Sequence, residues 1–146
     1  MTVFPPSRFQ LQVAILKKRS QMSKLLTIEK ANEPLANYVR IHRRKAGLSQ
    51  RELGRVLGYK DEGPVSRHEQ CYSVPPLLIA LAYEIVFQAS VSEIFPGLRD
   101  AVELAVEEQL AALESELQGR SARTPGAAAV ARKLVWLSER RTSGFQ

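Results

Sequence analysis

The sequence contains very little cysteine and histidine. Its one cysteine, Cys71, excludes an internal disulfide framework and any site built from several thiolates. The two histidines are His42 and His68, and the pair His68-x-x-Cys71 supplies at most two of the four ligands that a structural zinc needs. We therefore expect no metal and no other cofactor, and we expect Cys71 to be an inert thiol rather than a redox switch.

Long apolar runs and catalytic patterns are missing as well. The longest apolar stretch, residues 74–87, is interrupted by Glu84 and is too short to span a membrane. The sequence presents no Ser/His/Asp set, glycine-rich phosphate loop or paired-carboxylate site. These absences predict a soluble, cytoplasmic protein that has no catalytic activity and does not bind a membrane.

The charge is distributed unevenly along the chain. The 146 residues carry a net charge of +6 and are 45% hydrophobic, which suits one small domain with appendages. Residues 1–60 hold 13 basic and 3 acidic residues, whereas residues 61–119 hold 2 and 11. Residues 120–146 are basic again, with 6 against 1. This asymmetry indicates a part that faces a polyanion, although runs of charge can also be ordinary solvated surface.

The first 33 residues have weak periodicity and scattered basic residues, and we interpret them as a basic, poorly ordered arm. An apolar run at residues 9–16 precedes Lys17-Lys18-Arg19. A secretory signal has the opposite order, with its positive charge before the apolar run. A helical turn is expected around Leu11–Leu16, and Met22 is an alternative natural start.

From Pro34 the apolar periodicity predicts short helices without any strand pattern. Helices end where glycine favours a stop, at Gly47 and Gly58, and begin at the S-x-x-E capping boxes of Ser49 and Ser90. The sequence therefore predicts an all-α fold whose residues 34–97 form a compact five-helix domain. The five expected helices cover residues 35–47, 49–57, 64–70, 75–87 and 90–95.

Two longer helices are expected after this domain. Residues 98–118 place leucine and valine on one helical face and acidic residues on the others. Residues 119–126 are expected to be a linker containing Pro125, and residues 127–146 a second amphipathic helix, with Trp136, and a tail. The acidic helix could form a homodimer seam, pack back on the five-helix domain, or hold a protein partner.

Residues 50–69 have the pattern that a helix-turn-helix needs. The expected buried face consists of Leu53, Val56 and Leu57. Gly54 is small where the next helix must cross closely, and Gly58 allows a sharp turn. Val65 anchors the following helix and leaves its first residues exposed. A helix presented in this way fits the major groove of DNA, with its first residues touching base edges.

Here the chain resembles the lambda-repressor-like (Cro/Xre-type) helix-turn-helix DNA-binding family. The resemblance covers roughly residues 35–98 and combines five fragments in the correct order and spacing. The fragments are Leu48-Ser49-Gln50-Arg51-Glu52-Leu53-Gly54, Leu57-Gly58, Val65-Ser66-Arg67-His68-Glu69, Pro75, and Ser90-Val91-Ser92-Glu93-Ile94-Phe95.

The resemblance implies roles for individual residues. Arg43 and Glu69 match a structural pair that ties the first helix to the end of the third, and Gln50 matches a phosphate-binding position. Arg67 is the first choice for reading a base, since arginine can bind guanine bidentately. The expected base-facing residues are Glu62, Gly63, Ser66 and Arg67, and the expected phosphate-binding residues are Gln50, Arg51, Arg44 and Lys60. Arg40, Lys45 and Arg55 add further positive charge to the first two helices.

Three features depart from the family pattern. The turn at residues 59–63 is one residue longer than usual, so the base-facing assignments can slip by one. Asp61 and Glu62 put negative charge at the DNA-facing edge, where they can cap the third helix, or Glu62 can accept from a cytosine amine. Cys71-Tyr72-Ser73 replaces the glycine and basic residues common after the glutamate.

The sequence thus predicts a transcriptional regulator that binds a specific double-stranded DNA operator, as a homodimer. The alternative is an antitoxin or adaptor whose C-terminal helices bind a protein partner.

Overall fold

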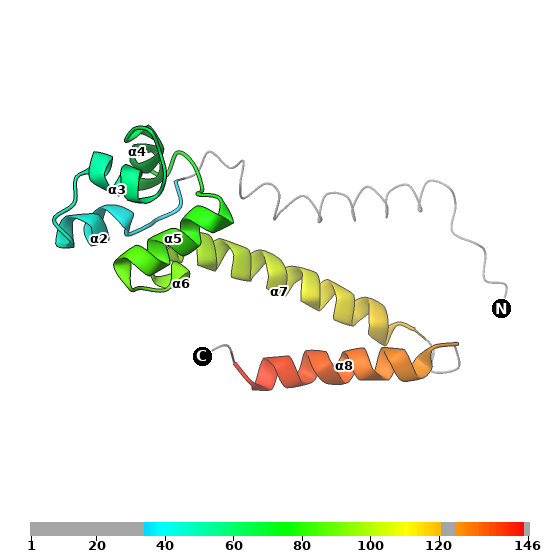
Figure 1. The fold of residues 1–146 in the computed structure, drawn as a ribbon. Helices are drawn as coiled ribbons and strands as arrows, with labels where there is room; N and C mark the ends of the chain where they lie inside the picture. Colours follow the sequence, from blue (N-terminus) through cyan, green and yellow to red (C-terminus); the bar gives the residue numbers. More distant parts are fainter. Residues whose placement is uncertain (1–33, 121–124, 145–146) are drawn as a thin grey trace, which may run out of the picture. The chain divides into compact units, whose positions relative to one another are not determined.

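The structure is a computed structural model that describes residues 34–120 and 125–144. Within these residues the chain forms seven α-helices and no strand, so the predicted all-α class is confirmed (Figure 1). The chain divides into two compact units, one ending at Glu103 and the other beginning at Leu104. The expected N-terminal arm, with its turn at residues 11–16, lies outside the described residues.

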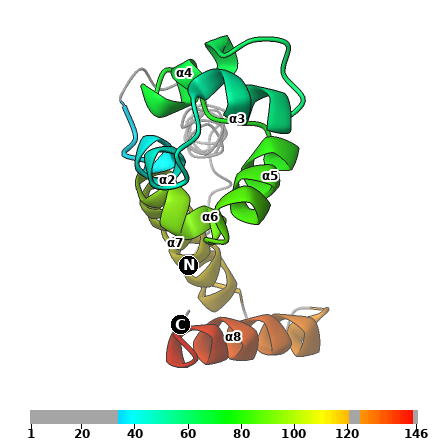
Figure 2. The ribbon, with the colours of Figure 1, turned by 60° about the vertical axis from the view of Figure 1, so that its left-hand side comes forward.

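Five short helices, α2 to α6, gather around one core in the first unit (Figures 1 and 2). They are α2 (Val39–Lys45), α3 (Gln50–Val56), α4 (Gly63–Glu69), α5 (Leu77–Phe87) and α6 (Val91–Ile94).

The first helix begins later than the sequence predicted. Residues 34–38 are not helical, because their backbone is hydrogen-bonded to distant segments. The Tyr38 N–H donates to the Ile94 carbonyl at 2.7 Å, and the Ala36 carbonyl accepts from the Gly97 N–H at 3.0 Å. These bonds tie the entry of α2 to the end of the five-helix unit, so the helical periodicity at residues 35–38 was a misleading signal.

The expected helix caps are present. The side chains of Ser49 and Ser90 each accept from the backbone N–H three residues on, and Glu52 and Glu93 reach back to the serine N–H groups. Both are complete capping boxes, which satisfy backbone donors that a helix start otherwise leaves free.

The ends of α2, α3 and α4 share one form. In each, the backbone N–H groups of the left-handed residue and of the residue after it donate to carbonyls of the last helical turn, which is the Schellman arrangement. The residue that takes the left-handed conformation is Gly47 after α2 (φ 72°), Gly58 after α3 (φ 85°) and Cys71 after α4 (φ 61°). Glycine adopts this conformation without strain, whereas cysteine does not.

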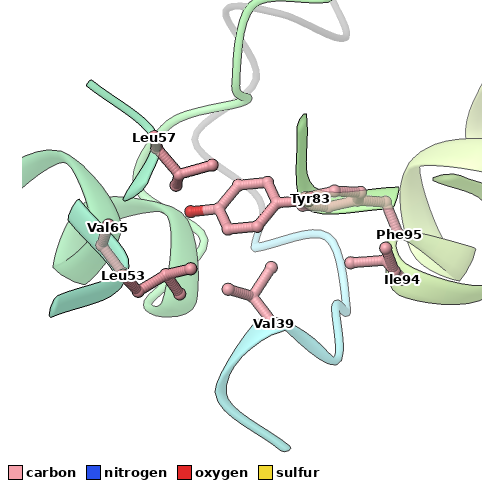
Figure 3. Close-up of a cluster of buried hydrophobic side chains, with 7 residues drawn as sticks. All are labelled: Val39, Leu53, Leu57, Val65, Tyr83, Ile94 and Phe95. Carbon is pink, nitrogen blue, oxygen red and sulfur yellow. The ribbon is translucent and has the colours of Figure 1, made fainter. Parts of the chain in front are cut away.

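Seven buried side chains form the core of the first unit (Figure 3). Tyr83 of α5 is fully buried at its centre and its ring stacks on Phe87 with centroids 5.7 Å apart. The Tyr83 hydroxyl lies 3.0 Å from Nδ1 of the buried His68, so the one polar group of the tyrosine is satisfied inside the core. The cluster consists of Val39, Leu53, Leu57, Val65, Tyr83, Ile94 and Phe95.

The next helix, α7 (Pro96–Gln118), also differs from the prediction. The Pro96-Gly97 pair was expected to stop the chain before a helix starting at Leu98, but α7 begins at Pro96 itself. Proline suits a first helical position, where no intrahelical N–H bond is lost. A Cβ on Gly97 would lie 2.5 Å from the Ala36 backbone nitrogen, so a side chain here would collide with the entry segment.

The second unit holds the rest of α7 and the last helix, α8 (Ala127–Thr142). Leu117 of α7 and Leu137 of α8 are buried, at 2% and 4% exposure. Ion pairs join Glu107 to Arg140 and Glu114 to Arg141. The acidic helix is therefore paired with α8 within a single chain. Of the expected linker, residues 121–124 are outside the described part.

Candidate nucleic-acid interface

Helix α4 has one buried face and one exposed face. Val65 and His68 are buried at 0% and 4% exposure, three residues apart on the same side of the helix. Glu62 and Arg67 are exposed, and Gly63 and Ser66 are half-buried. Helical spacing puts these four on the side away from the core, so the expected base-facing set shares one outward surface.

The guanidinium group of Arg67 is available for a ligand. The side chain is exposed and forms no ion pair or hydrogen bond with any residue that the structure describes. Ser66 is less free, because its hydroxyl accepts from the Gln70 side chain at 3.3 Å. Arg67 is therefore the side chain of α4 best placed to make a new bidentate contact.

The two acidic residues before α4 have different environments. Asp61 accepts from the Gly63 N–H through Oδ1 at 2.8 Å, so it caps the helix start. Glu62 occupies the N-cap position but its side chain makes no capping bond. The Glu62 carboxylate therefore remains exposed at the edge of the surface that Arg67 occupies.

The turn between α3 and α4 is held by close backbone contact. Gly54 is buried in α3, and a Cβ added there would lie 2.9 Å from the Asp61 carbonyl oxygen. The neighbour that requires a small residue is thus the turn before α4, rather than the helix itself. Gly54 and the left-handed Gly58 together place α4 across α3 at short range.

Arg43, Gln50 and Glu69 form one polar cluster that links α2, α3 and α4. The Arg43 guanidinium donates to both Glu69 carboxylate oxygens, at 2.5 and 3.2 Å, and also to the Leu48 carbonyl at 2.8 Å. Gln50 donates from Nε2 to Glu69 Oε2 at 2.8 Å. The expected phosphate-binding residue Gln50 is therefore held by Glu69, which positions its amide at the start of α3.

Hydrogen bonds, rather than burial, decide the direction in which the pKa values of this cluster shift. Burial alone would raise the pKa of Glu69, but the hydrogen bonds from Arg43 and Gln50 outweigh it and leave this pKa lowered. The hydrogen bond to Glu69 also raises the pKa of Arg43. Both groups are thus charged at neutral pH, and the ion pair is permanent under physiological conditions.

His68 behaves differently because it has no acidic partner. Burial, assisted by the nearby charge of Arg67, lowers the pKa of His68 to about 4. Its ring is therefore neutral at pH 7 and bonds to the Tyr83 hydroxyl, whose own pKa is raised by burial. His68 is therefore a residue of the core.

One residue of this region was missed by the sequence analysis. Asn37 donates from Nδ2 to the His68 carbonyl at 2.9 Å and to Cys71 Sγ at 3.1 Å, while its Oδ1 accepts from the Val39 N–H at 3.2 Å. It ties the end of α4 to the start of α2. The signal was available, since asparagine is a preferred residue just before a helix.

Apart from the ion-paired Arg43, the basic side chains of α2, of α3 and of the turn after α3 are exposed, whereas most acidic ones nearby are engaged. Glu69 is paired with Arg43, and Glu52 and Asp61 bind helix-starting N–H groups. The exposed cations form no ion pair with any described residue, and the basic residues of α2–α4 outnumber the acidic ones, so the net charge of this region is positive. These exposed cations are Arg40, Arg44, Lys45, Arg51, Arg55 and Lys60.

Within the described ranges, no helix is both long and apolar enough to cross a membrane. No protein-family model, curated protein or solved structure matches this chain.

Proposed function

We propose that this protein is a transcriptional regulator that binds a specific double-stranded DNA sequence through α4. The observation that carries the proposal is the outward face of this helix, where Arg67 is exposed and has no internal partner. The first turn of a helix can enter the major groove, and arginine can bind the O6 and N7 atoms of guanine bidentately.

The surroundings of α4 support the same proposal. The exposed cations of α2 and α3 would bind phosphates and supply most of the affinity, through release of counterions. The Gln50 amide, held at the start of α3 by Glu69, would add a directed phosphate contact. The resemblance of residues 35–98 to the Cro/Xre-type family points to the same use of these positions.

The decisive experiment selects bound duplexes from a random pool and then compares binding to the enriched sequence with binding to random duplex. Arg67→Ala should weaken operator binding by about 1–3 kcal/mol while leaving binding to random duplex nearly unchanged. Arg51→Ala should weaken both equally and reduce the salt dependence, because a phosphate contact carries no sequence information. Arg132→Ala is the matched control, since it removes an exposed arginine from α8.

Equal losses on operator and random duplex for Arg67→Ala would show that α4 does not read the sequence. If the selection enriches no sequence at all, the DNA-binding proposal fails. The alternative, a protein-interaction module, would then be favoured by α8, where Val135 and Trp136 are 53% and 52% exposed.

A further inference from the structure

Helix α5 exposes a stripe of aliphatic side chains. Leu77, Leu81 and Ile85 follow one another at intervals of four residues and therefore line one side of the helix. Leu77 is 73% exposed, Leu81 42% and Ile85 71%, and the neighbouring Leu78 is 80% exposed. We refer to these four residues as the α5 stripe.

The opposite side of α5 is already used by the core. Ala80 and Tyr83 are buried, and Ile79, Val86 and Phe87 pack against the buried cluster. The helix is thus apolar on both sides, although a helix at the surface of a soluble protein usually has a polar outer face. No residue among those that the structure describes buries Leu78 or Ile85.

The α5 stripe carries no charge. Glu84 is the one charged residue of the helix, and its carboxylate is turned to the start of α6, where it accepts from the Val91 N–H at 2.8 Å. A partner that recognised this surface by charge would find nothing to pair with. A second identical stripe, in contrast, could pack against it without burying an unpaired charge.

The exposed area is adequate for a small interface. The exposed fractions of the four residues add up to between two and three complete aliphatic side chains. At on the order of 100 Å² of apolar surface for each such side chain, the stripe offers roughly 250–300 Å². A small interface buries up to about 600 Å² on each partner, of which a little over half is apolar. The stripe supplies most of that apolar part.

We propose that the occupant of the α5 stripe is the α5 stripe of a second copy of this chain. In a two-fold pair of antiparallel helices the same patch faces itself, so Leu81 would lie opposite Leu81 and Leu77 opposite Ile85. The interface is small, so the dimer dissociates on dilution. A two-fold dimer suits the palindromic operator expected from the proposed function, but its formation does not depend on DNA.

The proposal differs from one of the three alternatives that the sequence left open for the acidic helix, namely that it forms the homodimer seam. In the structure α7 is joined to α8 by two ion pairs, and each helix buries a leucine. The α5 stripe has no such cover from the described residues.

The test measures the mass of the full chain by sedimentation velocity over a roughly hundredfold concentration range, without DNA. The wild type should shift from monomer to dimer as concentration rises. The double variant Leu78→Glu/Ile85→Glu should remain monomeric throughout. The matched control Val135→Glu/Trp136→Glu places two charges on an equally exposed apolar pair of α8 and should dimerise as the wild type does.

A cross-linking measurement covers the case in which the charged variant fails to fold. Leu81→Cys in a Cys71→Ser background should form an intermolecular disulfide, with air and copper phenanthroline as the oxidant. Val56 of α3 was expected on a buried face but is 61% exposed, so it offers a comparable exposed position away from α5. Val56→Cys should form no intermolecular disulfide.

The proposal is overturned if the wild type is monomeric at every concentration, or if Leu81→Cys cross-links no better than Val56→Cys. It is also overturned if the α8 control loses the dimer and the α5 variant retains it, because the seam then lies in the second unit. A dimer that forms through α5 and selects no DNA sequence would support this inference while rejecting the proposed function.

Discussion

Replacing Glu69 by alanine should destabilise the five-helix unit more than any exposed substitution would. The Glu69 side chain is 2% exposed and accepts hydrogen bonds from Arg43 and Gln50. The Arg43 side chain is only 11% exposed, so without Glu69 its charge would be largely buried, with the Leu48 carbonyl as its remaining partner. Three helices lose their common connection at the same time.

The expected loss follows from the cost of leaving one charge of a buried pair alone. Such a change typically destabilises a protein by about 3–5 kcal/mol. A domain of this size is stabilised by only about 5–15 kcal/mol in total, so Glu69→Ala should lose at least roughly a fifth of the free energy of unfolding. Glu69→Gln keeps an acceptor in the same place and should lose less, about 1.5–3 kcal/mol.

Urea denaturation followed by far-ultraviolet circular dichroism measures these losses. The comparison is valid when the free energy of unfolding falls with urea concentration at the same slope in each variant. The informative variant is Arg43→Met/Glu69→Leu, which removes both charges and fills the space with apolar atoms. We expect this double variant to be more stable than Glu69→Ala, because no uncompensated charge is left. A loss below about 1 kcal/mol for Glu69→Ala would refute the reasoning. So would a double variant whose loss of unfolding free energy equals the sum of the losses of Arg43→Met and Glu69→Leu measured separately.

Two further predictions concern His68 and Cys71, at the same end of α4 as Glu69. The pKa of His68 is about 4 in the folded chain and 6.5 when unfolded, so the unfolded state binds the extra proton between these values and stability falls as pH falls from about 6.5 to 4. Urea denaturation at a series of pH values should show a loss on the order of 3 kcal/mol in the free energy of unfolding. His68→Phe should make this free energy less dependent on pH. An equal pH dependence in both proteins would contradict this origin. Cys71→Gly should raise the melting temperature by a few degrees, because glycine relieves a left-handed conformation that costs cysteine roughly 1 kcal/mol, and the thiol contact with Asn37 that is lost is weak. Cys71→Ala keeps the strain and loses the Asn37 contact, so a rise for alanine as well would point to another cause.

The parts of the fold that were predicted from the sequence depend on neighbours close in the chain. The capping boxes at Ser49 and Ser90 join residues three apart, and the stops at Gly47 and Gly58 depend on one backbone conformation each. Such signals are complete within a few residues. Helix starts and stops were accordingly predicted well wherever they used these devices.

The parts that were not predicted depend on partners far along the chain. The delayed start of α2 follows from bonds between residues 36–38 and residues 94–97. The start of α7 at Pro96 belongs to the same contact, since Gly97 must approach the backbone of Ala36. The outer face of α5 is another case, because a helix that is apolar all round does not indicate which of its sides the core will cover.

The candidate site was predicted as a set of residues, but not as an electrostatic arrangement. A count of charges cannot tell which carboxylates are engaged, and this decides what a polyanion would meet at the surface. The structure engages Glu52 and Asp61 with backbone N–H groups and Glu69 with Arg43, which leaves Glu62 as the one acidic group of α2–α4 without such a bond among the described residues. The separation of free cations from engaged anions is a tertiary property. It leaves the net charge of α2–α4 unchanged, because a hydrogen-bonded carboxylate keeps its charge, but it decides which charged groups a polyanion would find without a bonding partner.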